Sequence, residues 1–340
     1  MLAIILVGGQ GTRLRPLTYE TPKQMLPLVG VPMIEGVFAS LATHGVTEAV
    51  LSLGYLPDRF TEAYPDNVIA GLPVRYAVEP TPLDTAGAIR FAAESAGVDD
   101  TFLVVNGDIV SDLDVSRLVA FHRRRAARAT IALHPVKDPS HFGVVPTDED
   151  GRVLAFVEKP PADEAPTNMI NAGYYVFEPR ALDLVAPDRP VSVERETFPA
   201  LAAEGSLYAL GDDAYWLDTG TPHAYLTANI DVLTGRRATP APGVVGGSWR
   251  HPSATVDASA SVRRSVVDRE CVVGADVVIE DSVLLPGAVV QSGCAVRWSI
   301  IGPEAVVGTR STLGPTCVVG AKEHVAAESE LSGDVRLGGV

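Results

Sequence analysis

The C-terminal third of the chain repeats small apolar residues at a nearly fixed interval, which restricts its fold more than any other feature. Aliphatic residues recur close to every sixth position, and glycines stand between them. A six-residue period is typical of a left-handed parallel β-helix, in which three short strands make one turn. The positions expected to point inward are Val256, Val262, Val272, Val278, Leu284, Val290, Val296, Ile301, Val306, Thr312 and Val318. The period slips around residues 264–272. The alternative, a β-sandwich, would show period-two runs separated by turns.

The first 235 residues have a different pattern, in which apolar runs alternate with helical segments. This alternation predicts an α/β fold with a Rossmann-like, mixed but mostly parallel sheet. Strands are expected over residues 2–7, 48–53, 73–78, 102–106 and 129–136, and helices from Pro32 to Gly45 and over residues 85–96, 114–127 and 193–204. Strands near residues 142–146, 152–158 and 170–178 predict an inserted antiparallel patch. Ser192 and Thr221 are good helix N-caps, and Pro222 suits a first helical position.

A chain of 340 residues is long enough for two domains. Residues 236–250 are rich in proline and glycine, which is typical of a linker. We therefore predict one domain over residues 1–235 and a hexapeptide-repeat domain over residues 251–340.

A glycine-rich loop follows the first predicted strand. Residues 6–18 read LVGGQGTRLRPLT, and residues 1–30 carry Arg13, Arg15 and Lys23 against the single acid Glu20. Glycine lets the backbone approach a ligand closely, so this loop predicts an anion site. No lysine follows Gly11 as a P-loop requires, and Leu14 stands where the dinucleotide motif has its third glycine.

This loop, together with TPKQMLP, NGD, VEKP, NAG and YWLDTGTP further along, resembles the sugar nucleotidyltransferases, also called nucleotide-sugar pyrophosphorylases. Within that family the chain is most similar to the mannose-1-phosphate guanylyltransferases. The resemblance covers essentially the whole chain. It implies a nucleotidyltransferase catalytic domain over residues 1–235, which joins a nucleoside triphosphate to a sugar 1-phosphate and releases pyrophosphate. GTP and mannose 1-phosphate are the expected substrates.

The resemblance also implies roles for individual residues. Arg13 and Lys23 are the expected catalytic residues, and Asp108 and Asp218 are the expected ligands of Mg²⁺, which takes carboxylate and phosphate oxygens. The expected nucleotide-binding residues are Leu6, Gly8, Gly9, Gly11, Thr12, Arg13, Glu79, Asp84, Thr85 and Gly87. The expected sugar-phosphate-binding residues are Asn106, Gly143, Glu158, Lys159 and Asn171.

Several of these positions also have ordinary structural interpretations. Asp84 departs from the family's usual glycine, and we favour a role as the N-cap of helix 85–96. Asp112 and Asp114 are expected to cap the next helix. Glu158 and Lys159 could form a solvated charge pair at a turn. Glu79 accepts hydrogen bonds and donates none, which suits the adjacent N1–H and N2 amino donors of guanine.

Composition limits the other partners. The net charge of −15 argues against nucleic acid and anionic membranes. The chain shows neither a leader nor an apolar run that could span a bilayer, so a cytoplasmic enzyme is expected. Its three cysteines, Cys271, Cys294 and Cys317, lack zinc or disulfide spacing and are interpreted as small buried residues. A homo-oligomer formed through the repeat domain is expected.

Three alternatives remain. The same chemistry could act on glucose, heptose or a sugar-like cyclitol 1-phosphate. The chain could be a regulatory subunit that binds a nucleotide sugar without turnover, although the metal and phosphate positions are intact. A hexapeptide acyltransferase would place catalysis in the repeat, where only His251 and His324 occur.

Overall fold

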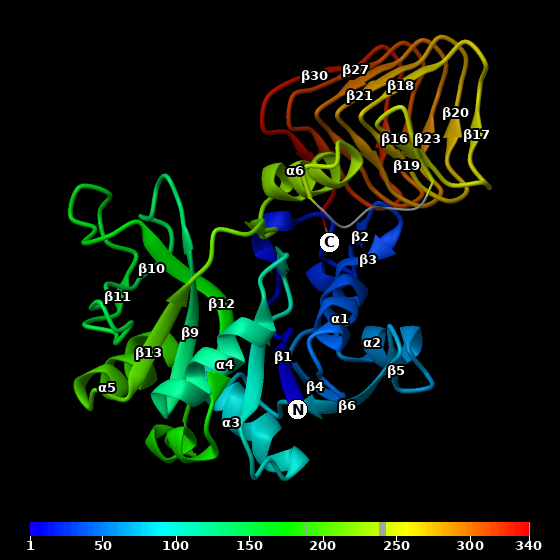
Figure 1. The fold of residues 1–340 in the computed structure, drawn as a ribbon. Coiled ribbons are helices and arrows are strands. Elements are labelled where there is room, and N and C mark those ends of the chain that lie inside the picture. The colour runs from blue at the N-terminus through cyan, green and yellow to red at the C-terminus, as the bar shows by residue number, and fades with distance from the viewer. Residues whose placement is uncertain (188, 238–242, 340) are drawn as a thin grey trace. The chain divides into compact units, whose positions relative to one another are not determined.

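The structure is a computed structural model that describes residues 1–187, 189–237 and 243–339. It contains two compact units. The first unit comprises Met1–Gly9 and Ile34–Trp216, and the second comprises Gln10–Met33 and Leu217–Val340. The glycine-rich loop thus begins in the first unit and continues in the second. Figure 1 shows the elements of both units.

The first unit is built on a mixed ten-stranded sheet. Its main path runs β11-β10-β12-β7-β1-β4-β6-β5, and β9 and β13 join it through β12. The strands are β1 (Leu2–Leu6), β4 (Glu48–Leu53), β5 (Val68–Ile69), β6 (Leu72–Val78), β7 (Phe102–Asn106), β9 (Ala129–Pro135), β10 (Gly143–Val144), β11 (Val157–Glu158), β12 (Met169–Phe177) and β13 (Leu207–Gly211), with the short β8 (Ile109–Ser111) nearby in sequence. Strands β7, β1, β4 and β6 are parallel. Strand β12 runs antiparallel to both β7 and β9. This confirms a parallel centre with an antiparallel patch.

Helices pack against this sheet as expected for an α/β fold. They are α1 (Met33–Thr43), α2 (Asp58–Ala63), α3 (Asp84–Ala96), α4 (Val115–Arg125) and α5 (Phe198–Ala203), with a 3₁₀ segment η3 (Pro179–Leu184) and a π-helical turn η4 (Val193–Thr197). Helix α3 packs against β1, β4 and β6, and α4 packs against β9, β12 and β13.

Helix ends agree with several sequence predictions and correct one. Asp114 is the N-cap of α4, accepting from the backbone N–H of Arg117 at 2.9 Å, and Ser192 caps η4 in the same way from Arg195 at 3.2 Å. Helix α1 starts one residue later than predicted, because Pro32 belongs to the small antiparallel pair β2 (Pro27–Leu28) and β3 (Val31–Pro32).

Two of the three predicted patch strands are shorter than expected, whereas the third agrees with β12. Of residues 142–146 and 152–158, Gly143–Val144 and Val157–Glu158 pair as strands β10 and β11. Proline has no N–H to donate, so the pairing cannot continue regularly through Pro146. Its carbonyl instead accepts from the N–H of Leu154 at 2.9 Å.

The second unit contains a parallel β-helix of three sheets. Figure 1 shows its stacked coils in yellow to red. The first sheet holds β15 (Val244–Val245), β16 (Ser248–Arg250), β19 (Val266–Val267), β22 (Val283–Leu284), β25 (Ile300–Ile301), β28 (Val318–Val319) and β31 (Arg336–Leu337). The second holds β17 (Thr255–Val256), β20 (Val272–Val273), β23 (Val289–Val290), β26 (Val306–Val307) and β29 (His324–Val325). The third holds β18 (Ser261–Arg263), β21 (Val278–Glu280), β24 (Ala295–Arg297), β27 (Thr312–Leu313) and β30 (Glu330–Leu331).

The inward positions of this β-helix agree only partly with the prediction. Val256, Val262, Leu284, Val290, Val296 and Ile301 pack in or against its core as expected. At five positions the following residue fills the core, namely Val273, Ile279, Val307, Leu313 and Val319 in place of Val272, Val278, Val306, Thr312 and Val318. Neighbouring strand residues point to opposite faces, so an error of one residue reverses the face. The three cysteines are free and buried, as predicted.

The helix α6 (Pro222–Leu233) ties the remaining parts of the second unit together. Thr221 caps it, accepting from the N–H of Ala224 at 3.2 Å, and Pro222 follows as predicted. The Tyr225 hydroxyl donates to the carbonyl of Pro27, and the N–H of Val29 donates to Asn229 Oδ1 at 2.9 Å. Helix α6 thereby anchors the segment that follows the glycine-rich loop.

The predicted linker of residues 236–250 includes the first strand of the β-helix. Strand β16 pairs in parallel with β19, so the coil already begins at Ser248. Residues 238–242 of this predicted linker lie outside the described residues. Within the described ranges, no helix combines the length and the apolar character needed to cross a membrane.

Candidate active site

The glycine-rich loop leaves the end of β1 and makes a tight turn. Gly11 has a φ of 63° and precedes the 3₁₀ turn η1 (Thr12–Leu14). Its carbonyl accepts from the Thr18 hydroxyl at 2.8 Å. A Cβ at Gly11 would lie 3.3 Å from Lys23 Cβ, so the lysine stem packs against the turn. Lys23 itself begins the 3₁₀ turn η2 (Lys23–Met25).

Arg13 and Asp218 lie together in the second unit. Arg13 Nη2 is 3.8 Å from Asp218 Oδ2, and the two side chains are 63% and 27% exposed. Asp218 ends the strand β14 (Trp216–Asp218), and its Oδ1 accepts from the N–H of Gly220 at 2.8 Å. A Cβ at Gly220 would lie 2.4 Å from Arg13 Nη2. A side chain at position 220 would therefore displace the guanidinium from this position beside Asp218.

Glu79 lies beside the start of the loop, within the first unit. Its Oε1 would lie 3.4 Å from a Cβ at Gly8. The Ser52 hydroxyl donates to Oε1 at 3.3 Å, and the N–H of Leu83 donates to Oε2 at 3.1 Å. Burial raises the pKa of this carboxyl above its ordinary value, although both hydrogen bonds lower it. The structure therefore holds Glu79 as a half-buried acceptor next to Gly8.

Asp84 differs from the predicted N-cap. It is the first residue of α3, with Leu83 in the cap position, and its Oδ1 accepts from the adjacent N–H of Thr85 at 2.7 Å. A capping side chain instead bonds to an N–H two or three residues on. Asp84 has a φ of 57°, in the left-handed region. Glycine takes this conformation without steric cost, which accounts for the usual glycine at this position.

Thr85 and Gly87 connect α3 to η4 and to the residues immediately before it. The Thr85 hydroxyl donates to Glu194 Oε2 and accepts from the N–H of Val193, both at 2.8 Å. The N–H of Gly87 donates to the carbonyl of Val191 at 3.2 Å. Both predicted nucleotide-binding residues therefore also have structural contacts.

The predicted sugar-phosphate residues form two groups in the first unit. In one, Glu158 Oε1 lies 2.9 Å from Lys159 Nζ, and a Cβ at Gly143 would lie 3.2 Å from Glu158 Oε2. The Lys159 side chain is 59% exposed. A Cβ at Gly143 would also come within 2.4 Å of Phe156 Cζ, so this glycine makes room for an aromatic ring of its own chain.

The second group surrounds a bulge in β12. Asn171 Nδ2 donates to the Tyr175 hydroxyl at 2.9 Å, and its Oδ1 accepts from the N–H of Gly173 at 2.9 Å. Gly173 has a φ of 76°, and a Cβ there would lie 2.8 Å from Asn106 Nδ2. Burial raises the pKa of Tyr175, which keeps its hydroxyl a hydrogen-bond donor. The sequence prediction missed Tyr175, whose only signal was its place near NAG.

Trp216 is a second residue that the sequence prediction missed. Its Nε1 donates to the carbonyl of Ala172 at 2.9 Å. The indole stacks on His134 at a ring-centroid distance of 5.4 Å and meets Phe142 edge-on at 5.6 Å. Burial lowers the pKa of His134, which favours a neutral ring. The signal was Trp216 within the YWLDTGTP segment.

One further observation concerns metal binding. In the part of the chain that the structure describes, no group of three or more His, Cys, Asp or Glu side chains could hold a metal ion. Mg²⁺ needs only one or two carboxylates beside water and phosphate oxygens, so the partly exposed Asp218 fits it chemically. Asp108 belongs to the first unit and Asp218 to the second.

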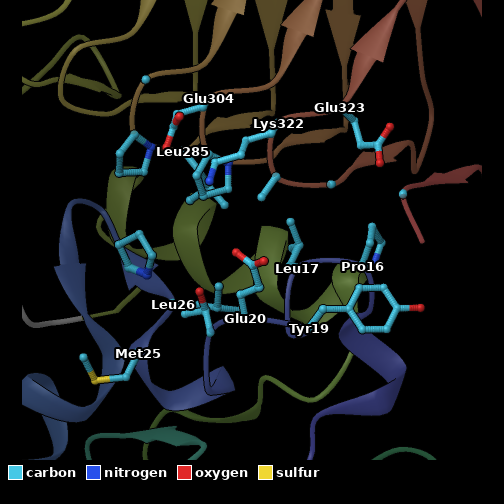
Figure 2. A pocket seen from close by; sticks show the side chains of 18 of the residues that line it. Pro16, Leu17, Tyr19, Glu20, Met25, Leu26, Leu285, Glu304, Lys322 and Glu323 are labelled. Carbon is cyan, nitrogen blue, oxygen red and sulfur yellow. The ribbon is translucent and has the colours of Figure 1, made fainter. Parts of the chain in front are cut away.

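The second unit also contains a pocket of about 600 Å³. Residues between Pro16 and Pro32 line one side of it, and turns of the β-helix line the other. Figure 2 shows Tyr19 and Glu20 on the first side and Lys322 and Glu304 on the second. None of the predicted site residues lines this pocket.

Comparisons with known proteins agree with this architecture. Residues 2–235 match the Nucleotidyl transferase family, and residues 244–337 match the GMPPB C-terminal domain. A protein from Mycobacterium tuberculosis named mannose-1-phosphate guanylyltransferase is 42% identical over 261 residues, which cover 76% of this chain and 72% of the relative. A mannose-1-phosphate guanylyltransferase catalytic subunit beta from Dictyostelium discoideum is 39% identical over 231 residues, covering 67% of this chain and 63% of the relative.

Solved structures are similar over the catalytic region. A putative glucose-1-phosphate thymidylyltransferase from Bacillus anthracis aligns with a TM-score of 0.61 at 23% identity, over 67% of this chain and 94% of its own, which supports the fold. HddC from Yersinia pseudotuberculosis aligns with a TM-score of 0.59 at 28% identity, over 67% of this chain and 97% of its own. From the matched residues and the identities of these relatives, the chain belongs to the nucleotidyl transferase family.

Proposed function

We propose that this chain transfers a guanylyl group from GTP to mannose 1-phosphate, forming GDP-mannose and releasing pyrophosphate. The observation that carries the proposal is the pairing of Arg13, in the glycine-rich loop, with Asp218 beside Gly220. It supports a site in which an exposed guanidinium is held ready for phosphate. The names of the relatives at about 40% identity supply the preferred substrates.

The reaction itself requires little covalent help from the protein. A phosphate oxygen of the sugar 1-phosphate attacks the α-phosphorus of the triphosphate, and the bond from that phosphorus to the β-phosphate oxygen breaks. The attacking oxygen is already anionic at neutral pH, so no general base is needed. The main barrier is the repulsion between two anions that must be held in line, which positioned cations lower.

Three basic residues of the chain would supply these positioned cations. Arg13 would stabilise charge on the departing pyrophosphate, and Lys23 would neutralise the triphosphate. Lys159 would anchor the phosphate of the sugar 1-phosphate, while Glu158 and Asn171 would hydrogen-bond to sugar hydroxyls. Each of the three cations has a local partner that orients it: Asp218 for Arg13, the Gly11 turn for Lys23 and Glu158 for Lys159.

Asp108 and Asp218 are the residues that we propose to hold Mg²⁺. When bound, Mg²⁺ would neutralise phosphate charge and help to align the reacting groups. The hard oxygen donors of the two aspartates suit this ion.

Glu79 would select the base. Its two oxygens accept one hydrogen bond each from Ser52 and Leu83, which leaves lone pairs for further donors. Guanine offers N1–H and the N2 amino group as adjacent donors, whereas uracil and thymine would present a carbonyl to the carboxylate. A half-buried carboxylate beside Gly8 therefore favours GTP.

The experiment that tests the proposal is a screen of pyrophosphate release. All common nucleoside triphosphates are crossed with mannose, glucose, heptose and cyclitol 1-phosphates in the presence of Mg²⁺. We expect the highest kcat/KM for GTP with mannose 1-phosphate. A higher value for another pair would overturn the substrate assignment, and no release with any pair would overturn the enzymatic role. We also propose a cytoplasmic location. We further propose a homo-oligomer formed through the β-helix, and light scattering would test the oligomeric state.

A further inference from the structure

The last coil of the β-helix breaks a pattern of buried aliphatic residues. Val266, Val283, Ile300 and Val318 occupy equivalent positions in successive coils and stack through parallel pairing. All four lie outside the core of the β-helix, yet each is at most 1% exposed, so another part of the chain covers this face. The next residue in the column is Arg336, paired with Val318. A charged residue therefore replaces an aliphatic one at the end of a covered face.

Arg336 donates hydrogen bonds to the glycine-rich loop. Its Nη1 lies 2.7 Å from the carbonyl oxygen of Arg13 and 3.4 Å from that of Arg15. These carbonyls lie at the end of the 3₁₀ turn η1, where helical carbonyls lack partners within the helix. A basic side chain is a suitable partner for such groups. Asp334 Oδ1 lies 3.2 Å from Arg336 Nε and orients the guanidinium.

Pro16 makes a second contact between this loop and the last coils. A Cβ at Gly320 would lie 3.1 Å from Pro16 Cγ, and one at Gly338 would lie 3.1 Å from Pro16 Cβ. Two glycines thus leave space for the proline ring. Figure 2 shows Pro16 and Leu17 on the loop side of the neighbouring pocket, with Lys322 and Glu323 on the coil side. The loop is therefore held immediately after Arg13.

Arg13 is fixed at both of its ends by these contacts. Its backbone carbonyl accepts from Arg336, and its guanidinium lies close to both Asp218 and Gly220. We propose that Arg336 is a positioning residue for nucleotidyl transfer, which holds the backbone of Arg13 so that the guanidinium is presented to the triphosphate. This inference rests on the proposed function, because it assigns Arg13 to the leaving pyrophosphate. It makes the last coil of the β-helix part of the catalytic apparatus.

Kinetics of full-length variants test the proposal. Arg336→Met keeps the aliphatic stem and removes every donor, and Arg336→Lys keeps a charged donor without the planar fork. The matched control is Arg310→Met, which removes an exposed β-helix arginine paired with Glu328. We expect Arg336→Met to lower kcat about tenfold, since hydrogen bonds from charged donors have this magnitude. KM should change little, Arg336→Lys should recover part of the loss, and Arg310→Met should match the wild type. Equal kcat values for Arg336→Met and Arg310→Met would overturn the proposal.

A double variant separates positioning from a general effect on stability. If Arg336 acts through Arg13, adding Arg336→Met to Arg13→Met should cause no further loss of kcat, whereas losses that multiply would contradict the proposal.

Hydrogen exchange provides a readout that does not depend on turnover. The amides of Leu14 and Arg15 donate to the carbonyls of Gly11 and Thr12 and should exchange faster in Arg336→Met than in Arg310→Met. Unchanged exchange at these amides would contradict the positioning role. If the wild type turned over no substrate pair, the proposed function would fail, and the exchange comparison would still decide whether Arg336 holds the loop.

Discussion

Arg13 Nη2 lies 3.8 Å from Asp218 Oδ2 and beside Gly220, where an added Cβ would come within 2.4 Å of the same nitrogen. An ion pair this exposed contributes at most about 1 kcal/mol to folding. The small contribution is useful at a catalytic site, because the guanidinium can transfer from the carboxylate to a phosphate without a large loss. In the function that we propose, Asp218 both orients Arg13 and holds Mg²⁺.

Asp218→Asn should lower kcat by roughly a hundredfold or more, because it removes the charge that we propose to organise both Arg13 and Mg²⁺. Asparagine can still accept from the N–H of Gly220, so the melting temperature should change little. The control is Asp281→Asn, which breaks the ion pair of Asp281 with Arg264 in the β-helix. Steady-state kinetics at saturating Mg²⁺ decide, and turnover of Asp218→Asn near that of the control would refute both roles.

Lys159→Met should raise KM for the sugar 1-phosphate more than KM for the nucleotide, because it removes a cation assigned to the sugar phosphate. Arg13→Met should act mainly on kcat, since its contact strengthens as pyrophosphate leaves. Lys137→Met, at another exposed lysine of the first unit, is the control for Lys159. Initial rates with each substrate varied in turn would show the two patterns, and their exchange would reverse the assigned roles.

Leu313→Ala should destabilise the protein far more than Thr312→Ala. Leu313 is fully buried in the β-helix core, whereas Thr312 is exposed. Truncating a buried leucine typically costs about 2–5 kcal/mol, and a surface change costs about 0.5 kcal/mol or less. Urea unfolding followed by circular dichroism makes the comparison. Equal midpoints for the two variants would show that the inward register is wrong.

This pair of residues also shows what the sequence could predict about the fold. The six-residue period was enough to predict a β-helix, because it depends only on the spacing of apolar residues. It could not place every inward residue, since most of its strands contain two consecutive apolar residues, such as Val306 and Val307. Paired residues of successive coils lie 17 positions apart at Val266 and Val283 and 18 positions apart at Ile300 and Val318, so a strict six-residue count cannot hold throughout, and only strand pairing fixes the register.

The site shows a comparable limit. The motifs placed Arg13, Asp218, Glu158 and Lys159 in recognisable segments. The structure pairs the neighbours Glu158 and Lys159, and it pairs Arg13 with Asp218 from a different segment. The role of Arg336 could not be predicted, because it depends on a contact between residues 323 positions apart. The left-handed φ of Asp84 could not be predicted from the sequence either, since an aspartate before a helix usually indicates a cap.

His122 should make folding stability depend on pH. It is buried, with Nδ1 2.8 Å from Thr130 Oγ1 and Nε2 3.1 Å from Glu178 Oε1. Burial lowers its pKa below the ordinary value of 6.5, so the unfolded chain binds a proton more readily than the folded chain. The contribution of neutral His122 to stability should therefore be complete above pH 6.5. The free energy of unfolding should fall as the pH drops from 6.5 towards the lower folded pKa.

Urea unfolding from pH 8 to pH 5 measures this effect. His122→Gln cannot titrate and should flatten the dependence, whereas His324→Gln, at an exposed position of the β-helix, should leave it as in the wild type. A dependence that is identical in the wild type and in His122→Gln would exclude His122 as its source.

Glu79→Gln should weaken the preference for GTP. The side-chain amide replaces one acceptor with a donor that would face the donors of guanine, and one such pair is worth about 1–3 kcal/mol, or roughly ten- to a hundredfold in relative kcat/KM. Ser52→Ala is the control, because it removes the hydrogen bond to Oε1 and leaves the carboxylate in place. The ratio of kcat/KM for GTP to that for UTP should fall in Glu79→Gln and stay close to the wild-type ratio in Ser52→Ala.

The pH dependence of the same ratio tests the role of the charged form. Burial raises the pKa of Glu79, so its carboxylate should take up a proton at a higher pH than an exposed glutamate does. As the pH falls through that raised pKa, the protonated carboxyl loses acceptor capacity, and the wild-type preference for GTP should decline. Glu79→Gln has no carboxyl at this position, so its ratio should stay flat over the same range. A wild-type ratio that also stays flat, or a wild type that prefers UTP throughout, would contradict base selection by Glu79.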